Sequence, residues 1–312
     1  MSRGAAIRAE QTDGAEVVLD LKSVGKTYGS GDAANVAIAD ISFAVRKNEL
    51  ISIVGPSGCG KTTLIKIIAG LHQHTHGTYE VEGEKVRFNS PREALDHGIA
   101  TVYQDLAVVP LMPVWRNFFL GNEVRKGPVM DRAGMRKTAK QELLDMGIDL
   151  RDVDQPIGTL SGGERQCVAI ARAVHFGAKV LILDEPTAAL GVKQAGVVLR
   201  YIIQARERGL GVIFITHNPH HAYPVGDRFL LLNRGRSIGY YAKNEISLAE
   251  LTGLMAGGAE LEQLTHELEQ FGDEDSELRH VAEAFEHEVA ELGVGPTPPP
   301  DQSAGRHEPP SP

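Results

Sequence analysis

A glycine-rich segment near residue 55 has the residue types and spacing needed to bind nucleotide phosphates. It reads Gly55-Pro56-Ser57-Gly58-Cys59-Gly60-Lys61-Thr62 and is followed by Thr63. In such a loop the backbone N–H groups point at phosphate oxygens, and the N-terminus of the next helix adds positive potential. Lys61 supplies a mobile cation for the β- and γ-phosphates, and the Thr62 hydroxyl is suited to ligate Mg²⁺. We therefore expect a nucleotide-phosphate site here.

The elements on either side of this loop are the ones that its chemistry requires. The apolar run Leu50–Val54 predicts a buried strand that enters the loop. Residues 62–69 carry apolar side chains at helical spacing and are followed by Gly70. A strand, a glycine loop and a helix follow one another as in a P-loop.

Further polar residues follow other predicted strands. Asp184 and Glu185 come directly after the apolar run Val180–Leu183. A carboxylate at this edge can hold Mg²⁺, and Asp184 is the expected ligand. Gln104 and His217 each follow a predicted strand, at the sheet edge where ligands of α/β proteins collect.

A second glycine-containing anion site stands between the phosphate loop and the acidic strand. It is the pentapeptide Leu160-Ser161-Gly162-Gly163-Glu164, just before a helix predicted to start at Arg165. Taken in chain order, these segments resemble the nucleotide-binding subunit of an ATP-binding cassette (ABC) transporter. The resemblance covers roughly residues 17–257.

This resemblance implies an α/β fold, a RecA-like P-loop NTPase. A parallel sheet core is expected with an N-terminal antiparallel β subdomain and an inserted helical subdomain at about 105–165. The alternation of strands and helices along the chain favours the same class. The remaining predicted segments are a flexible N-terminus (1–16), an acidic amphipathic helical tail (258–295) and a proline-rich disordered end (296–312).

The resemblance also implies an ATPase that uses ATP and Mg²⁺. Glu185 would polarise the attacking water, His217 would contact the γ-phosphate, and Gln104 would touch Mg²⁺ or the water. Tyr28 matches the aromatic residue that stacks on adenine, although the same residue also suits a hairpin or a core.

By the same resemblance Ser161, Gly162 and Gly163 close over the ATP of an opposing subunit. The active unit is then a dimer; we expect a homodimer, and a heterodimer stays open. Two residues depart from the family pattern. Asn48 stands where glycine is usual and tolerates a left-handed turn. Gly191 stands where aspartate is usual. The chain therefore lacks a carboxylate that the resemblance links to coupling between the subunits.

Composition limits the other functions open to the chain. The 312 residues carry a net charge of -9, and the region from residue 259 onward is strongly acidic. The concentrated basic face of a nucleic-acid binder is missing from the sequence, so we expect no nucleic-acid partner. No run reaches the ~20 apolar residues of a membrane helix. The resemblance implies a cytoplasmic protein that is peripheral on the inner face of the cell membrane.

The segment from Phe88 to Gly121 is similar to the cassettes of bacterial monosaccharide importers. This implies partner permease subunits and, indirectly, a periplasmic or lipid-anchored sugar-binding protein. A cassette for another small solute and a soluble ABC-type ATPase without a permease remain alternatives. A non-hydrolytic interaction module is disfavoured by Glu185 and His217.

Two interpretations of the apolar segment Leu106–Leu120 stay open, and one segment can serve both. It forms the core of the helical subdomain, or part of a groove for a cytoplasmic helix of the permease. In the second case, mutation of Trp115 or Phe119 is expected to uncouple transport from ATP binding.

Overall fold

The computed structural model describes residues 15–31 and 34–256. Contacts divide the chain into two compact units, residues 1–251 and 252–312, and the second is described only over residues 252–256. The predictions for the acidic tail (258–295) and the proline-rich end (296–312) lie outside the described residues. So does the prediction for the N-terminus, apart from residues 15 and 16.

The elements of the described residues alternate between strands and helices. The strands are β1 (Val17–Tyr28), β2 (Asn35–Arg46), β3 (Leu50–Val54), β4 (His76–Val81), β5 (Glu84–Lys85), β6 (Ile99–Val102), β7 (Arg125–Lys126), β8 (Val129–Met130), β9 (Val180–Asp184), β10 (Gly211–Thr216), β11 (Arg228–Asn233) and β12 (Arg236–Ala242). The helices are α2 (Lys61–Ile68), α3 (Pro91–Asp96), α4 (Val114–Phe118), α5 (Arg132–Asp145), the 3-10 helix η2 (Ile157–Thr159), α6 (Gly162–His175), α7 (Val192–Glu207), α8 (Pro219–Val225) and α9 (Leu248–Met255).

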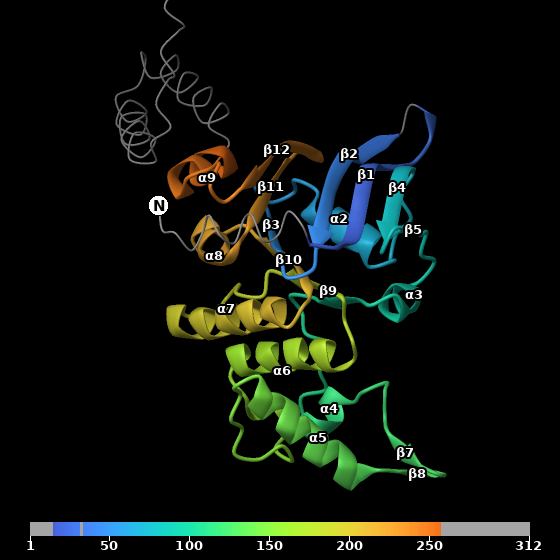
Figure 1. Ribbon diagram of the computed structural model, residues 1–312, viewed down its shortest axis with the longest axis vertical. Coiled ribbons are helices and arrows are strands. Elements are labelled where there is room, and N and C mark those ends of the chain that lie inside the picture. The colour runs from blue at the N-terminus through green and yellow to red at the C-terminus, as the bar shows by residue number, and fades with distance from the viewer. Residues whose placement is uncertain (1–14, 32–33, 257–312) are drawn as a thin grey trace, which may run out of the picture. The chain divides into compact units, whose positions relative to one another are not determined.

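Ten of the described strands form one sheet in the order β5-β4-β1-β2-β12-β11-β3-β10-β9-β6 (Figure 1), and β7 and β8 form a separate two-stranded sheet. Strands β11, β3, β10, β9 and β6 are parallel neighbours. Strands β5, β4, β1 and β2 are antiparallel. This confirms the predicted fold class, a parallel core with an N-terminal antiparallel β subdomain.

The central strands are buried because their sequences are apolar on both faces. Every residue of β3 and β10 is buried, as are the first four of β9. Helix α2 buries Leu64, Ile65, Ile67 and Ile68 in the same core. The strand before the phosphate loop and the helix after it are therefore fixed by one apolar cluster.

Helices α6, α4 and α5 lie on the far side of α7 from the sheet in Figure 1. Helix α6 contacts α7 and also packs against α4 and α5. The small hairpin β7–β8 precedes α5. None of the helices within residues 15–31 and 34–256 is long and apolar enough to cross a membrane.

Three local predictions need correction. Helix α6 begins at Gly162 rather than Arg165, because Ser161 caps it and the glycines form its first turn. The sequence Ser90-Pro91-Arg92-Glu93 predicts a capping box, but it is only half formed, since Glu93 accepts the N–H of Asn89 instead of that of Ser90. The apolar run Ile99–Tyr103 predicts a buried strand, and β6 ends one residue earlier, at Val102.

Candidate functional site

The phosphate loop follows β3 and passes close to a neighbouring strand. A Cβ on Gly55 would lie 2.1 Å from the carbonyl oxygen of Leu232 in β11, so only glycine fits here. Gly60 has a φ of 106° and precedes α2. These two glycines let the chain reverse between a buried strand and a buried helix.

The first turn of α2 offers unpaired N–H groups. Leu64 N donates to Gly60 O at 3.0 Å. The N–H groups of Lys61, Thr62 and Thr63 meet no acceptor in the part of the chain that the structure describes. The Lys61 ammonium donates to the carbonyl oxygens of Gly55 and Pro56. A lysine and several donors therefore share one small surface, which is suited to a phosphate group.

The predicted carboxylates follow β9 beside this loop. Burial raises the pKa of Asp184, the Glu185 charge adds to the effect, and the Lys61 charge opposes it. Glu185 adopts a φ of 48°, which is unusual for a residue with a side chain. Its Oε1 lies 2.9 Å from Nδ1 of His217, and its Oε2 is buried with no hydrogen-bond partner among the described residues.

Strand register explains why these groups meet. Ile215 of β10 pairs with Asp184 of β9, and Thr216 of β10 pairs with Val54 of β3. The chain beyond each strand therefore emerges at the same edge. The N–H of Glu185 also donates to Ile215 O at 2.9 Å, which ties the loop after β9 to β10.

Gln104 and Tyr28 lie at exposed positions. Val102 of β6 pairs with Leu183 of β9, and Gln104 follows two residues beyond that pair. Tyr28 ends β1 with 39% of its surface exposed. The ring of His72 meets it edge-on at 5.9 Å between centroids. An exposed ring at the end of a strand is available to a planar ligand.

The second anion site of the sequence, residues 160–164, forms the capped start of helix α6. Ser161 Oγ accepts from Glu164 N at 3.3 Å, and Ser161 N donates to Glu164 Oε2 at 2.7 Å. A Cβ on Gly162 would lie 3.0 Å from Leu190, and Gly163 faces Gln194. Within the described residues, no hydrogen bond or ion pair joins this segment to Lys61 or Glu185.

The residues expected to uncouple transport are in the interior. Trp115 is 3% exposed and Phe119 is 2% exposed, and the indole N–H of Trp115 donates to Asp154 at 2.8 Å. The burial of Trp115 and Phe119 supports the first interpretation of this segment, the core of the helical subdomain. Leu111 of the same segment is 89% exposed.

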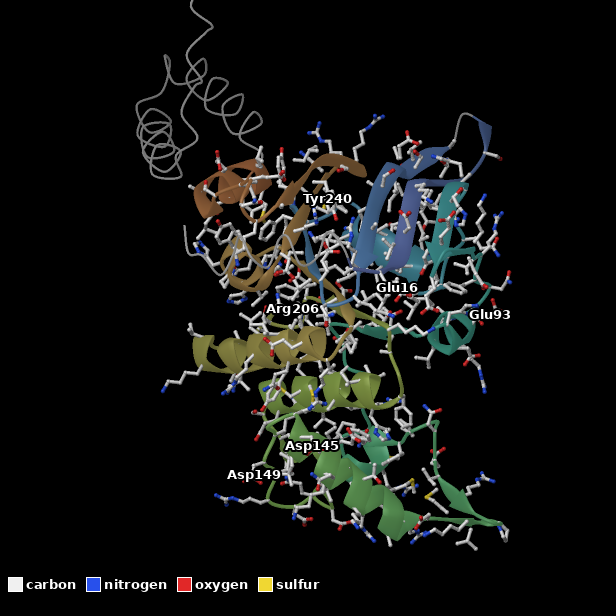
Figure 2. All side chains as sticks on the ribbon, in the orientation of Figure 1. Glu16, Glu93, Asp145, Asp149, Arg206 and Tyr240 are labelled. Carbon is white, nitrogen blue, oxygen red and sulfur yellow. The ribbon has the colours of Figure 1, made fainter. Side chains whose placement is uncertain are left out.

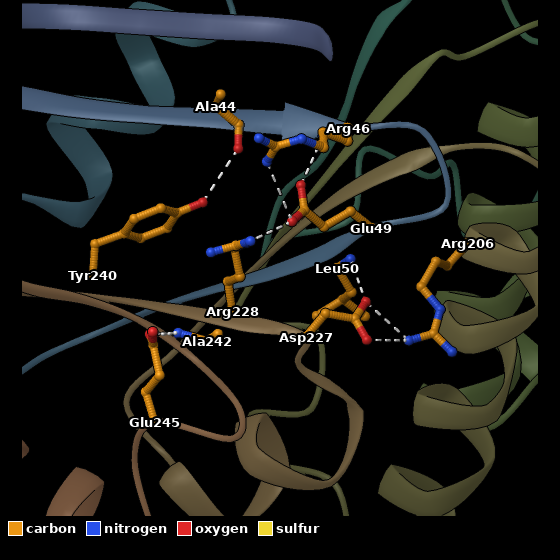
Figure 3. Close-up of polar contacts among 10 residues, drawn as sticks. All are labelled: Ala44, Arg46, Glu49, Leu50, Arg206, Asp227, Arg228, Tyr240, Ala242 and Glu245. Carbon is orange, nitrogen blue, oxygen red and sulfur yellow. Dashed lines mark hydrogen bonds and ion pairs between the residues drawn. The ribbon is translucent and has the colours of Figure 1, made fainter. Parts of the chain in front are cut away.

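Sequence reasoning missed two groups of residues. Thr187 and His221 are hydrogen-bonded beside the site, and the pair Asn218-Pro219, an N-cap followed by proline, is the signal that could have predicted α8. Two buried ion pairs lie at the other end of β3 (Figure 3): Glu49 with Arg228, and Asp227 with Arg206. Their members are more than twenty residues apart in the chain, so no local pattern reveals them.

Comparison with known proteins assigns the family. A model described as ABC transporter matches residues 38–188. The xylose/arabinose import ATP-binding protein of Sulfolobus acidocaldarius is 41% identical, over 78% of this chain and 95% of that protein. The chain belongs to the ATP-binding proteins of ABC transporters. Members of this family bind ATP, and the chain is an ATPase of the ABC type.

Other relatives and structures agree with this family. The fructose import ATP-binding protein of Rhizobium meliloti is 38% identical over 78% of this chain and 96% of that protein. A putative ribose/galactose/methyl galactoside import ATP-binding protein of Burkholderia lata is 35% identical, and the match spans 45% of its length. A dimeric bacterial ABC transporter cassette has a TM-score of 0.61 and 29% identity, covering 72% of this chain and 98% of that one.

Proposed function

We propose that this ABC ATPase drives uptake of a monosaccharide through a partner permease. The observation that carries the hydrolytic part is Glu185, held by His217 at 2.9 Å, whose second carboxylate oxygen is buried and has no hydrogen-bond partner within residues 15–31 and 34–256. Support for the sugar comes from relatives named for xylose/arabinose and fructose import.

The residues present fit ATP with Mg²⁺. The unpaired N–H groups of Lys61, Thr62 and Thr63 suit phosphate oxygens. The half-buried Asp184 carboxylate and the exposed Thr62 hydroxyl are the oxygen ligands that Mg²⁺ prefers. When bound, the ion would neutralise charge on the phosphates. We assign the phosphate contacts to residues 55–63 and the metal to Thr62, Asp184 and Gln104.

Residues of this chain would then orient the attacking water and accept its proton. Glu185 Oε2, which has no partner among the described groups, is placed to accept a hydrogen bond from the attacking water. His217 orients the other carboxylate oxygen and is 61% exposed, so it can also reach a γ-phosphate. Tyr28 would stack on the adenine ring.

The second half of each site would come from another ATP-binding subunit. Ser161 uses its oxygen as a helix cap, and its hydroxyl hydrogen remains able to donate to a phosphate. Gly162 and Gly163 begin α6 at the same point. The dimeric cassette among the similar structures supports this pairing. We propose a homodimer.

An apolar pocket beside Gln104 is proposed to receive the permease. Its volume is about 190 Å³, and its lining includes Leu106, Val108, Arg172 and Phe176. The pocket joins the end of β6 to α6, so an occupant would touch the nucleotide edge and the helical region together. A cytoplasmic helix with an apolar face fits such a groove. The chain would then lie on the cytoplasmic face of the membrane, and a periplasmic or lipid-anchored binding protein would supply the sugar.

Uptake by cells that lack this gene tests the proposal. We expect loss of uptake of one radiolabelled monosaccharide among xylose, arabinose, ribose and fructose. Wild-type protein should restore it, and Glu185→Gln should not. Unchanged uptake of all four sugars would refute monosaccharide import and favour another solute, or a soluble ATPase if no permease co-purifies.

The docking surface is tested separately by placing a charge in its apolar lining. Leu106→Asp and Val108→Asp should abolish co-purification of the permease while the purified subunit still binds ATP. The matched control is Val129→Asp in the β7–β8 hairpin, where the native side chain is 67% exposed and does not line the pocket. Retention of the permease by both pocket variants would exclude this surface.

A further inference from the structure

The loop after β9 has an unusual backbone at two positions on either side of Thr187. Glu185 has a φ of 48° and Ala189 has a φ of 58°. A left-handed backbone at a residue with a side chain is strained and persists only where surrounding contacts enforce it. The loop that carries Glu185 therefore depends on contacts from outside itself.

Thr187 provides one such contact. Its side chain is buried at 3% exposure, and its Oγ1 lies 2.9 Å from Nδ1 of His221 in α8. Burial lowers the pKa of His221, and the charges of His220 and His217 act in the same direction. A neutral imidazole can donate to or accept from a hydroxyl group, so either tautomer sustains this bond.

The segment after β10 carries His217 and His221 and is anchored by hydrogen bonds and by apolar packing. Asn218 caps α8: its N–H donates to Thr216 Oγ1 at 3.1 Å, and its Oδ1 accepts from His220 N at 2.9 Å. Ala222 and Val225 bury the inner face of the helix. His217 and His221 thus project from one anchored segment onto Glu185 and Thr187 of the neighbouring loop.

We propose that His221 is a positioning residue for ATP hydrolysis, holding the loop that carries Glu185 through the Thr187 hydroxyl. The inference rests on the proposed role of Glu185. Two histidines from one segment then fix the loop at two points, one at the carboxylate and one two residues later. Without the second bond the backbone at Glu185 can relax, and its carboxylate moves from the site.

Steady-state ATP hydrolysis by the purified full-length protein tests this role. His221→Ala should lower kcat on the order of ten-fold, the scale of one part-buried hydrogen bond, and leave KM for ATP unchanged. His221→Asn, whose side-chain amide can replace Nδ1, should recover most of the rate. The matched control is His220→Ala, which removes an exposed neighbouring imidazole and should behave as wild type.

The partner residue gives an independent test. Thr187→Val should lose as much kcat as His221→Ala, and the double variant should lose no more than either, because one bond is removed in all three. Thr187→Ser should stay near wild type. Circular dichroism and unfolding curves identify any variant that fails to fold, and the Asn and Ser variants then carry the test.

Three outcomes would overturn the inference. They are wild-type kcat in His221→Ala, equal losses in His221→Ala and His221→Asn when both are folded, and additive losses in the double variant. Glu185→Gln in the same assay separates this failure from failure of the proposed function. If Glu185→Gln is inactive and His221→Ala is not impaired, only the role of His221 is wrong; if Glu185→Gln keeps wild-type turnover, both proposals are wrong.

Discussion

The two ends of β3 treat charge in opposite ways. At its amino end, Asp227 receives two contacts of 3.0 Å from Arg206 and the N–H of Leu50 at 2.8 Å (Figure 3). The place of Arg206 in the whole fold is labelled in Figure 2. At its carboxyl end, Glu185 keeps one buried oxygen without a partner among the described groups.

The difference separates charges that hold the fold from charges kept for a ligand. A buried polar group without a partner costs free energy, and a ligand that supplies the missing hydrogen bond removes that cost. Paired buried charges fix elements instead: Arg206 joins the last turn of α7 to Asp227 at the start of β11. Substitutions at the amino end are therefore expected to change the free energy of unfolding, and substitutions at the carboxyl end are expected to change the rate of ATP hydrolysis.

Removal of a paired charge should have the largest effect on stability. Asp227→Ala leaves Arg206, with 7% of its side chain exposed, without its carboxylate. We expect a loss of about 3–5 kcal/mol in the free energy of unfolding, measured by urea denaturation. The control is Glu80→Ala, which breaks an exposed pair with Lys22 and should cost about 1 kcal/mol or less. Equal losses in both variants would remove the distinction between buried and exposed pairs.

Removal of the phosphate-loop cation should affect activity instead of stability. Lys61→Met should lower ATP turnover about 10²–10³-fold, the scale of one lost electrostatic contact to the transferring group. Its unfolding free energy should stay near wild type, because the partners of Lys61 among the described residues, the carbonyl groups of Gly55 and Pro56 and the Cys59 sulfur, are at exposed or part-buried contacts. Lys66→Met, in the last turn of the same helix, is the matched control and should keep full turnover.

Much of the carboxyl end could be predicted from sequence because its signals are local. The apolar run of β3, the glycines and Lys61 lie within a dozen residues and are read without tertiary information. The capping box at Ser247 was likewise expected and is formed with Glu250. Asn48 has a φ of 61°, as its position in place of glycine indicated.

The features that sequence could not supply depend on distant residues. Glu49 and Arg228 are 179 residues apart, and Thr187 and His221 are 34 apart. The sequence left Trp115 open between a core position and a docking groove, and the fold decides for the core: Trp115 is buried and its indole N–H donates to the exposed Asp154. Side-chain burial and pairing follow from packing, which apolar spacing alone does not determine.

A pH series should detect the cost of burying Glu49. Burial raises its pKa, although the Arg46 N–H bond and the charges of Arg46 and Arg228 oppose the shift. The folded state then holds the proton more tightly than the unfolded state. The stability of wild type relative to Glu49→Gln should fall as pH rises above 4.5 through the raised pKa. A relative stability that rises over this range would contradict dominant burial.

The smallest effect is expected at Gly191, the N-cap of α7, which has no side-chain hydrogen bond. Gly191→Asp restores an acceptor where a Cβ meets no atom within 4 Å. It should stabilise the fold by about 0.5 kcal/mol through the cap and the helix dipole. Gly191→Ala adds a side chain without an acceptor and should not stabilise it. A gain as large in Gly191→Ala would show that capping is not the cause.

The rate of ATP hydrolysis by Glu185→Gln, measured together with its unfolding free energy, tests the central claim most directly. Glutamine keeps the size of the side chain but cannot take a proton from water. We predict a loss of turnover of about 10²–10⁴-fold. ATP binding should persist, and the change in stability should be no more than about 1 kcal/mol. Turnover within a few-fold of wild type would show that Glu185 does not act on water.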